Sequence, residues 1–460
     1  MTKGLSKEQR QFLKDLFPGN NSLFQTEEAY IFGTDASRLF APPWAVVRPQ
    51  SKEQVQGLLR WAQIEKIPII PRARGTNVVG DCVPYSGGVV VSTLLLDRII
   101  LVDEENGLAV VEPGVVTASL QDRLRARGLF YPPDPASVKI STIGGNVSTN
   151  AGGLRAVKYG VTKDYILGIE AVLAGGERIN TGSKCRKDVV GLDLTRLLIG
   201  SEGTLAFFTE IICKILPLPE ISLSILVGFK TLEEAMSLCL QVFKTGILPV
   251  AMELMDEQVI KCLEDNIGSK DFQDAQALLL FQFDGSKAAV LDDYRQMNSL
   301  LHEMEPLFFE QGRSPSEEEE LWDIRRMINP ASFRLGSGKL SVDITVPRGI
   351  IKKAIEQIKE IGQEFSLSIL TFGHVGDGNI HVNIMFDDGN EKDRLAAENA
   401  LDKVLFRVIA LEGTISGEHG VGVTKLPYFC HQIGNVETNV MKKIKDSFDP
   451  SGIMNPGKGY

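Results

Sequence analysis

The sequence predicts an α+β protein of two domains, and three observations point to this fold class. The chain has 460 residues, a length that favours two or three domains. Short strand patterns alternate with helical patterns in the first 219 residues, with glycine-rich turns between them. After Pro219 the pattern changes to long helical segments separated by a few strands, which is typical of a second α+β domain.

The N-terminal part begins with about 40 residues of helix and loop. Ser51 and Gln54 then open a helix with a capping-box pattern, and this helix is expected to run to about Lys66. Strands are expected on both sides of it, and later in the segment, at 45–49, 67–70, 88–92 and 214–219. Glycine clusters between the last two strands predict a series of turns.

The second part carries helical patterns at 231–245, 287–310, 316–329, 349–366 and 390–411. Strands are expected between them, at 277–283 and 339–346. Ser316 and Glu319 are expected to form a capping box at the start of the third helix. The last 40 residues are predicted to be loop and short helix.

Composition excludes several classes of function. The net charge of −10 argues against a nucleic-acid-binding surface, which needs a basic face. The six cysteines form no C-x-x-C pair, so the sequence predicts neither an iron–sulfur cluster nor a cysteine zinc site. The polar N-terminus lacks the apolar stretch of a signal peptide, and no run approaches the roughly 18 apolar residues of a membrane helix. We therefore expect a reduced, cytoplasmic protein.

The first motif that points to a chemical function is the small-residue loop at 71–80, which follows a predicted strand. Small residues let backbone N–H groups approach an anion closely, as in phosphate-binding nests. The loop contains neither a G-x-G-x-x-G fingerprint nor a Walker lysine pattern, which excludes a Rossmann or P-loop interpretation. Taken alone, an ordinary glycine turn is the more frequent explanation of such a loop.

A second group of turns lies at 132–137, 141–146, 150–153 and 158–160. So many small-residue turns within 30 residues are costly in chain entropy. Either the turns fold over a large planar ligand, or neighbouring loops pack tightly against one another. The turn at 200–205, which leads into a strand containing Ile211 and Ile212, is weak evidence by itself.

Histidines give the sharpest signal, because three of only five fall in two short segments. Asp377 and Gly378 are flanked by strand-like residues and predict a two-residue hairpin loop. In that register His374 stands directly opposite His381 on one face of the hairpin, with Asn383 on the same face. Two imidazoles that close suit a divalent metal, although a lone histidine is more often structural. The other segment contains His419.

A helix in the second part carries Trp322, Arg325 and Asn329 on one stripe. Arg325 is a candidate for bidentate binding of a carboxylate. A surface ion pair between Arg325 and a nearby glutamate is the alternative, and the helix pattern does not choose between them.

Taken together these motifs resemble the FAD-linked oxidase family of the vanillyl-alcohol oxidase fold. The resemblance is to the branch of glycolate oxidase catalytic subunits, D-lactate dehydrogenases and D-2-hydroxyglutarate dehydrogenases, and it extends from about residue 35 to residue 458. The motifs that carry it are R-x-x-G-T, S-T-I-G-G-N, N-A-G-G, Y-G, G-S-E-G-T, G-H-x-G-D-G-N-x-H-x-N, S-G-E-H-G and D-P-x-G-I-M-N-P-G-K.

The resemblance implies a two-part FAD-binding domain, 1–219 with the returning tail 420–460, and a cap domain with an antiparallel sheet at 220–419. It implies non-covalent FAD, because the histidine that links FAD in other branches is absent. The implied cofactor-binding residues are Arg72, Ala73, Arg74, Gly75, Thr76, Asn77, Pro133, Ser137, Thr142, Gly144, Gly145, Asn150, Gly152, Gly153, Tyr159, Glu202, Gly203, Ile211 and Asn455. Ala73 and Arg74 stand where many members of the family have glycine or another small residue; Ala73 is expected to be tolerated, and Arg74 is expected to add a phosphate contact or alter the loop.

The resemblance also implies a metal site and a catalytic set. Zinc or a similar divalent ion is expected on His374, His381 and Glu418, and His419 resembles the catalytic base. Arg325 matches the arginine that binds the substrate carboxylate. Asn383 and Lys339 are further catalytic candidates.

The implied function is FAD-dependent oxidation of a small D-2-hydroxy acid, D-lactate or glycolate, to the 2-oxo acid. Electrons would pass to an iron–sulfur subunit, an electron-transferring flavoprotein or a quinone pathway, so the protein is expected in the cytoplasm or bound peripherally to the membrane through a partner. The alternatives are a D-2-hydroxyglutarate dehydrogenase and a flavin-binding electron-transfer subunit. Alkylglycerone-phosphate synthases share the fold but carry a run of histidines that is absent here.

Overall fold

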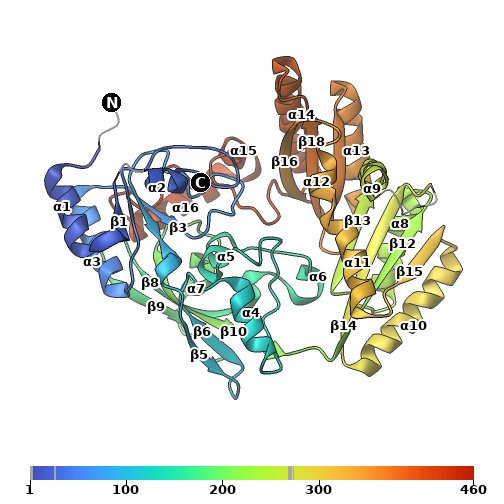
Figure 1. The fold of residues 1–460 in the computed structure, drawn as a ribbon, viewed down its shortest axis with the longest axis horizontal. Helices are drawn as coiled ribbons and strands as arrows, with labels where there is room; N and C mark the ends of the chain where they lie inside the picture. The colour runs from blue at the N-terminus through green and yellow to red at the C-terminus, as the bar shows by residue number, and fades with distance from the viewer. Residues whose placement is uncertain (1–3, 25–26, 268–271, 273) are drawn as a thin grey trace. The chain divides into compact units, whose positions relative to one another are not determined.

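The computed structural model describes residues 4–24, 27–267, 272 and 274–460 (Figure 1). Contacts within the chain divide it into two units. Unit 1 comprises Met1–Gly153, Val161–Leu218 and Glu418–Tyr460, and unit 2 comprises Leu154–Gly160 and Pro219–Gly417. The short segment Leu154–Gly160 therefore clusters with unit 2, although the sequence analysis assigned it to the first domain.

Unit 1 contains a four-stranded sheet in the order β1-β2-β4-β3. Its strands are Ser22–Leu23, Ala45–Val47, Val89–Ser92 and Ile69–Arg72 in that order. β4 runs parallel to both β2 and β3 and lies between them, and helix α3 (Lys52–Glu65) makes the crossover from β2 to β3. The predicted start of α3 is confirmed, because the side chain of Ser51 caps it by accepting from the backbone N–H of Gln54.

A second sheet of unit 1 is antiparallel, in the order β5-β6-β10-β8-β9. In that order the strands are Ile99–Asp103, Leu108–Val111, Phe207–Lys214, Ile166–Val172 and Arg178–Gly182. A separate two-stranded sheet pairs β11 (Leu216–Pro217) with β7 (Leu129–Phe130). Besides α3, the helices of unit 1 are α1 (Lys7–Leu16), α2 (Glu27–Tyr30), α4 (Thr117–Arg125), α5 (Ile143–Thr149), α7 (Leu194–Leu198), α15 (Leu426–Gln432) and α16 (Asn435–Phe448). The 14-residue α16 is longer than the short helix expected near the C-terminus.

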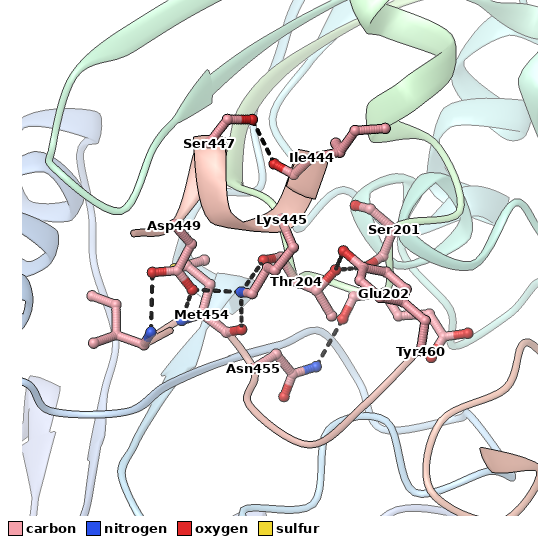
Figure 2. Close-up of polar contacts among 11 residues, drawn as sticks. Ser201, Glu202, Thr204, Ile444, Lys445, Ser447, Asp449, Met454, Asn455 and Tyr460 are labelled. Atoms are coloured by element: carbon pink, nitrogen blue, oxygen red, sulfur yellow. Dashed lines mark hydrogen bonds and ion pairs between the residues drawn. The ribbon is translucent and has the colours of Figure 1, made fainter. Parts of the chain in front are cut away.

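The C-terminal tail is fixed to unit 1 by the end of α16 (Figure 2). Asp449 is 1% exposed, and its carboxylate accepts hydrogen bonds from the backbone N–H groups of Ile453 and Met454 at 3.0 and 2.7 Å. It also pairs with the Nζ of Lys445, which in turn donates to the carbonyl oxygens of Thr204 and Met454. One buried carboxylate thus fixes the turn that returns the chain to β3.

We expect Asp449→Ala to lower the free energy of unfolding of the protein by about 3 kcal/mol. The substitution leaves two backbone donors without their acceptor and weakens the pairing of Lys445. The thermal midpoint, followed by circular dichroism, measures the effect. Asp446→Ala, on the same helix, is the control. A wild-type midpoint for Asp449→Ala would contradict this account of the tail.

Unit 2 is built on a seven-stranded antiparallel sheet, which confirms the antiparallel sheet predicted for this part of the chain. The strand order is β15-β12-β14-β13-β17-β18-β16. In that order the strands are Phe308–Gln311, Ile221–Phe229, Ala277–Gly285, Ala251–Asp256, Ser368–His374, Asn379–Phe386 and Gly338–Thr345.

The helices of unit 2 are α6 (Ala156–Tyr159), α8 (Leu232–Lys244), α9 (Glu257–Ile267), α10 (Lys287–Met304), α11 (Pro315–Arg326), α12 (Ile328–Ser332), α13 (Ile351–Phe365) and α14 (Glu391–Ala410). Apolar residues of α9, α11 and α12 share one core cluster with residues of β13, β17 and β18. Helices α13 and α14 lie side by side (Figure 1). In the described ranges no helix is both long and apolar enough to cross a bilayer.

The predicted capping box of Ser316 and Glu319 is wrong, because α11 begins earlier. Ser314 is the N-cap, and its side chain accepts from the backbone N–H of Glu317. Pro315 occupies the first helical position, where its fixed φ and missing N–H are tolerated. The proline therefore decides the start of the helix, and the capping pattern two residues later is not used.

Candidate active site

Unit 1 contains a cavity of about 280 Å³ whose lining comes from several distant parts of its chain. The predicted cofactor residues that line it are Arg72, Ala73, Gly75, Thr76, Asn77, Ser137, Thr142, Gly144, Gly145, Gly152, Glu202, Gly203 and Asn455. Small residues are needed at its walls. A Cβ on Gly145 would lie 3.2 Å from the Cβ of Ala73, and a Cβ on Gly152 would lie 2.8 Å from a carboxylate oxygen of Glu418.

Six predicted cofactor residues do not line this cavity: Arg74, Pro133, Asn150, Gly153, Tyr159 and Ile211. Arg74 is exposed, and Ile211 is fully buried in β10. Asn150 takes a left-handed backbone (φ +52°) at the end of α5, and its side chain accepts from the N–H of Lys163. Tyr159 belongs to unit 2, where its hydroxyl donates to Asp284 at 2.8 Å.

The cavity wall has polar groups that fit a polar ligand. Asp81 Oδ1, Thr93 Oγ1 and Ser141 Oγ belong to residues that line it, and each atom is buried without a hydrogen-bond partner among the residues that the structure describes. Buried polar groups are normally satisfied, so these atoms call for a ligand with donors and acceptors. FAD, with its pyrophosphate, ribityl hydroxyls and flavin edge, is such a ligand.

The C-terminal tail completes this wall. Asn455 Nδ2 donates to the carbonyl oxygens of Asp81 and Glu202, at 2.8 and 2.7 Å (the bond to Glu202 is drawn in Figure 2). Lys458 Nζ donates to the carbonyl oxygen of Val83 and to Asn455 Oδ1, at 2.6 and 2.9 Å. Through these bonds the tail is attached to Asp81, Val83 and Glu202, which lie about 250 to 375 positions earlier in the sequence.

Two acidic residues that line the cavity, Asp81 and Glu202, and the neighbouring Asp35 influence one another's ionisation. Burial raises the pKa of Asp81 to about 7, and the charges of Glu202 and Asp35 add to the rise. Burial also raises the pKa of Asp35 and of Glu202, although Glu202 accepts from the backbone N–H groups of Val421 and Gly422. Asp81 was not selected from the sequence; its only signal is a carboxylate beside Gly80 in the small-residue loop.

We expect Asp81→Asn to remove part of the pH dependence of stability. The pKa of Asp81 lies above its ordinary value of 3.8 in the folded state, so the folded state holds the proton more tightly than the unfolded chain. The stability that this proton provides is present below about pH 4 and is lost as the pH rises to about 7. At pH 8 the variant should be more stable by on the order of 2 kcal/mol. Thermal midpoints between pH 5 and 8 measure this; parallel curves for both proteins would contradict it.

The predicted register of the histidine hairpin is wrong. His381 stands opposite Phe372, and His374 stands opposite Glu253 on the neighbouring strand β13. The loop is longer than two residues, because the N–H groups of Asp377 and Gly378 both donate to the carbonyl oxygen of His374. At Gly373, with φ +148°, the regular pairing of β17 with β18 stops, since Phe372 is the last residue of β17 that pairs with β18.

The two histidines nevertheless remain neighbours. Their ring centroids lie 5.2 Å apart with the rings almost perpendicular, a diagonal contact across β17 and β18. Opposite residues of antiparallel strands share a face, so Phe372, His374 and His381 lie on the same face of the sheet as Glu253. The chemistry expected from two adjacent imidazoles does not depend on the predicted register.

Arg325, on α11, reaches this face. Its Nε donates to Glu253 Oε2 at 2.7 Å, and its guanidinium lies 4.7 Å from the centroid of Phe372. Glu253 is fully buried, and its other oxygen lies 2.5 Å from His374 Nδ1. Burial alone would raise the pKa of Glu253, but His374 and Arg325 outweigh it and lower the pKa to about 2. Arg325 thus pairs with a glutamate, but the pair is not at the surface, where the sequence analysis placed that alternative, because Glu253 is fully buried.

The other two catalytic candidates of unit 2 lie on the same face. Asn383 pairs with Ser341 of β16 and accepts from its hydroxyl, and Lys339 lies two residues earlier on that strand. Lys339 Nζ and Asn383 Nδ2 both donate to the side-chain oxygen of Asn329, at 3.2 and 3.5 Å. Asn329, at the start of α12, was noted in the sequence only as part of a helical stripe.

The S-G-E-H-G segment spans the junction of the two units. On the unit 2 side, the backbone N–H of Gly417 donates to Asp343 Oδ2 at 2.8 Å, and Asp343 stands opposite His381. On the unit 1 side, Glu418 and His419 line the cavity, and the carbonyl oxygen of His419 accepts from Asn77 Nδ2 at 2.9 Å. The segment therefore contributes Gly417 to unit 2 and the lining residues Glu418 and His419 to unit 1.

Glu253 is the residue that the sequence analysis missed. It lies in the apolar run Met-Glu-Leu-Met at 252–255. A carboxylate inside such a run is a usable signal, because a buried charge needs a partner. The partners, however, come from α11 and β17, so only the folded chain identifies them.

Comparison with known proteins agrees with this architecture. A family model described as FAD binding domain matches residues 43–182, and one described as FAD linked oxidases, C-terminal domain, matches residues 218–459. A glycolate oxidase subunit GlcD of Bacillus subtilis (strain 168) is 38% identical, covering 94% of this chain and 92% of that protein. A D-lactate dehydrogenase of Anaerostipes hadrus is 33% identical, covering 95% and 92%.

The solved structure of a p-cresol methylhydroxylase with substrate bound superimposes with a TM-score of 0.82 at 16% identity, over 100% of this chain and 98% of that one. At this identity the likeness shows the fold, and it confirms the predicted two-part FAD-binding domain with an α+β cap domain. The sequence relatives match almost the full chain, and the family models cover both its parts. This protein therefore belongs to the FAD-linked oxidase family and is an oxidoreductase with that family's FAD-binding domain.

Proposed function

We propose that this protein oxidises a small D-2-hydroxy acid, D-lactate or glycolate, to the 2-oxo acid and passes the electrons to a partner protein. The observation that carries the proposal is the face of unit 2 on which Arg325, His374 and His381 lie together. A 2-hydroxy acid has one carboxylate and one neighbouring hydroxyl. The carboxylate matches the cation of Arg325, and the hydroxyl matches a metal ion held by His374 and His381. The names of the relatives, glycolate oxidase subunit and D-lactate dehydrogenase, support the same class.

Residues of this chain have distinct roles in the proposed reaction. Arg325 binds the substrate carboxylate, and Asn383 and Lys339 orient the substrate from the same sheet face. His419 takes the proton of the hydroxyl as general base. When bound, FAD supplies the hydride acceptor, which is the cofactor's own chemistry. The cofactor is held without a covalent link by the cavity of unit 1.

The donor set also fits a divalent metal, zinc in particular. His374 and His381 are adjacent imidazoles, and Glu418 follows Gly417, whose backbone N–H donates to Asp343, the residue opposite His381. These three residues would hold the ion. A bound metal lowers the pKa of a hydroxyl that it contacts, which would assist removal of the proton by His419.

An anaerobic visible spectrum tests the reaction. Purified protein with bound FAD is mixed in turn with glycolate, D-lactate, L-lactate and D-2-hydroxyglutarate. Bleaching of the flavin bands by a D-acid or glycolate, and not by L-lactate, is the expected result. Protein that stays yellow with every acid would contradict the proposed substrate class.

Removal of the metal is expected to slow flavin reduction by about a hundredfold or more, because Lewis-acid assistance is worth several kcal/mol. The protein is dialysed against a chelator, and the rate of reduction by the best acid is measured before and after Zn²⁺ is restored. FAD absorbance should stay constant throughout. Unchanged rates would mean that the two histidines serve only as hydrogen-bond donors.

D-2-hydroxyglutarate is the alternative substrate, and Lys339 favours it. This second cation lies on the same sheet face as Arg325 and suits the second carboxylate of a dicarboxylic acid. Lys339→Met should then weaken use of D-2-hydroxyglutarate more than use of D-lactate.

The partner protein that receives the electrons is inferred from the name of the Bacillus subtilis relative, which is described as a subunit of glycolate oxidase.

A further inference from the structure

We propose that Glu253 is a positioning residue that fixes both the tautomer of His374 and the orientation of Arg325. The inference rests on the proposed function of the histidine pair and of Arg325, and it adds a residue that none of the motifs contains. Glu253 is fully buried in β13, and each of its two carboxylate oxygens contacts one of these side chains.

The sheet brings Glu253 to this position. In the antiparallel pairing of β13 with β17, Glu253 stands directly opposite His374, at the last residue of β17. Side chains opposite one another in such a pair have their β-carbons roughly 5 Å apart. A glutamate at this register therefore reaches the near nitrogen of the imidazole, and Glu253 Oε1 lies 2.5 Å from His374 Nδ1.

This contact decides which nitrogen of His374 can bind a metal. A carboxylate only accepts hydrogen bonds, so Nδ1 must carry the proton. Nε2 is then the nitrogen with the lone pair, and an ion can be bound only through it. A carboxylate behind a metal-binding histidine also raises the basicity of the ligand and holds the plane of the ring.

The second oxygen of Glu253 acts on Arg325 in the same way. Its 2.7 Å bond to Nε and the contact with Phe372 hold the guanidinium from two sides. With Nε committed to Glu253, the edge of the guanidinium formed by Nη1 and Nη2 is the one available for a bidentate substrate carboxylate. One buried anion thus fixes the ligand for the metal and the cation for the substrate at the same time.

Glu253→Gln separates this role from simple packing. Glutamine has nearly the same shape but offers one acceptor and one donor, whereas His374 Nδ1–H and Arg325 Nε–H both need an acceptor. Either the imidazole changes to the other tautomer or the arginine is left facing an N–H group. Asp256→Asn is the matched control, because Asp256 is a fully buried carboxylate on the same strand that bonds Thr371 and contacts neither His374 nor Arg325.

The affinity of the FAD-loaded, chelator-treated protein for Zn²⁺ is measured by competition with a chromophoric chelator. KM and kcat for the best hydroxy acid are measured in parallel. Glu253→Gln is expected to weaken Zn²⁺ binding 10- to 100-fold and to raise KM, with FAD content unchanged. Asp256→Asn should lower the thermal midpoint but leave the Zn²⁺ affinity at the wild-type value.

The outcomes separate this inference from the proposed function. Wild-type Zn²⁺ affinity and wild-type KM in Glu253→Gln overturn the positioning role while the hydroxy-acid reaction stands. Equal losses of Zn²⁺ affinity in Glu253→Gln and Asp256→Asn overturn it too, because the effect would then be general destabilisation. A wild-type protein that is bleached by a D-acid but binds Zn²⁺ no better than His381→Ala overturns both the metal site and this role for Glu253.

Discussion

Replacing His419 with alanine is expected to leave FAD bound and to slow its reduction by the hydroxy acid by about 10²- to 10⁴-fold, the range that a general base contributes. His419 lines the cavity of unit 1, and its backbone oxygen accepts from Asn77 Nδ2. Because that bond involves the main chain, truncating the side chain keeps the loop in place. Anaerobic stopped-flow reduction, with the visible spectrum recorded before mixing, measures the rate and the FAD content together.

His302→Ala is the matched control for this prediction. His302 lies on the exposed side of α10 and contacts Phe309, with no part in the histidine face or the cavity. Its removal should change neither the spectrum nor the rate. Wild-type reduction in His419→Ala would assign the proton transfer to another group.

Gly145→Val is expected to weaken FAD binding by about a hundredfold, which corresponds to the 1–3 kcal/mol that overpacking usually costs. A Cβ at this position already lies 3.2 Å from the Cβ of Ala73, which also lines the cavity, and this is tighter than an ordinary contact. The two methyl groups of valine then extend into the space that the cavity provides for the cofactor. Flavin retained after gel filtration, and the affinity of the stripped protein for added FAD, measure the change.

Gly145→Ala should give a smaller loss, because the single methyl group demands only a slight shift of Ala73. Gly349→Val is the control, since a Cβ on this exposed glycine meets no atom within 4 Å. Full FAD content in Gly145→Val would exclude this wall of the cavity as part of the cofactor site.

Local physics explains how much of the fold could be predicted from the sequence. The start of α3 was predicted from Ser51 and Gln54, because a cap is a contact between residues three apart. The same reasoning failed at Ser316, where Pro315 imposes an earlier start for α11. It failed again at the hairpin, since the dipeptide Asp-Gly favours a two-residue loop but Gly373 and the contacts of His374 with β13 select a longer one.

By itself the sequence determined the class of fold, the small-residue loops that enclose the cavity of unit 1, and the residue types of the histidine face. Those features depend on composition and on short spacings that are visible along the chain. Only the tertiary structure decided that Glu253 joins Arg325 to His374, and that Asn455 returns to Asp81 and Glu202. The residues of these contacts are 72 to 374 positions apart, so their positions depend on strand register and tail docking rather than on any local pattern.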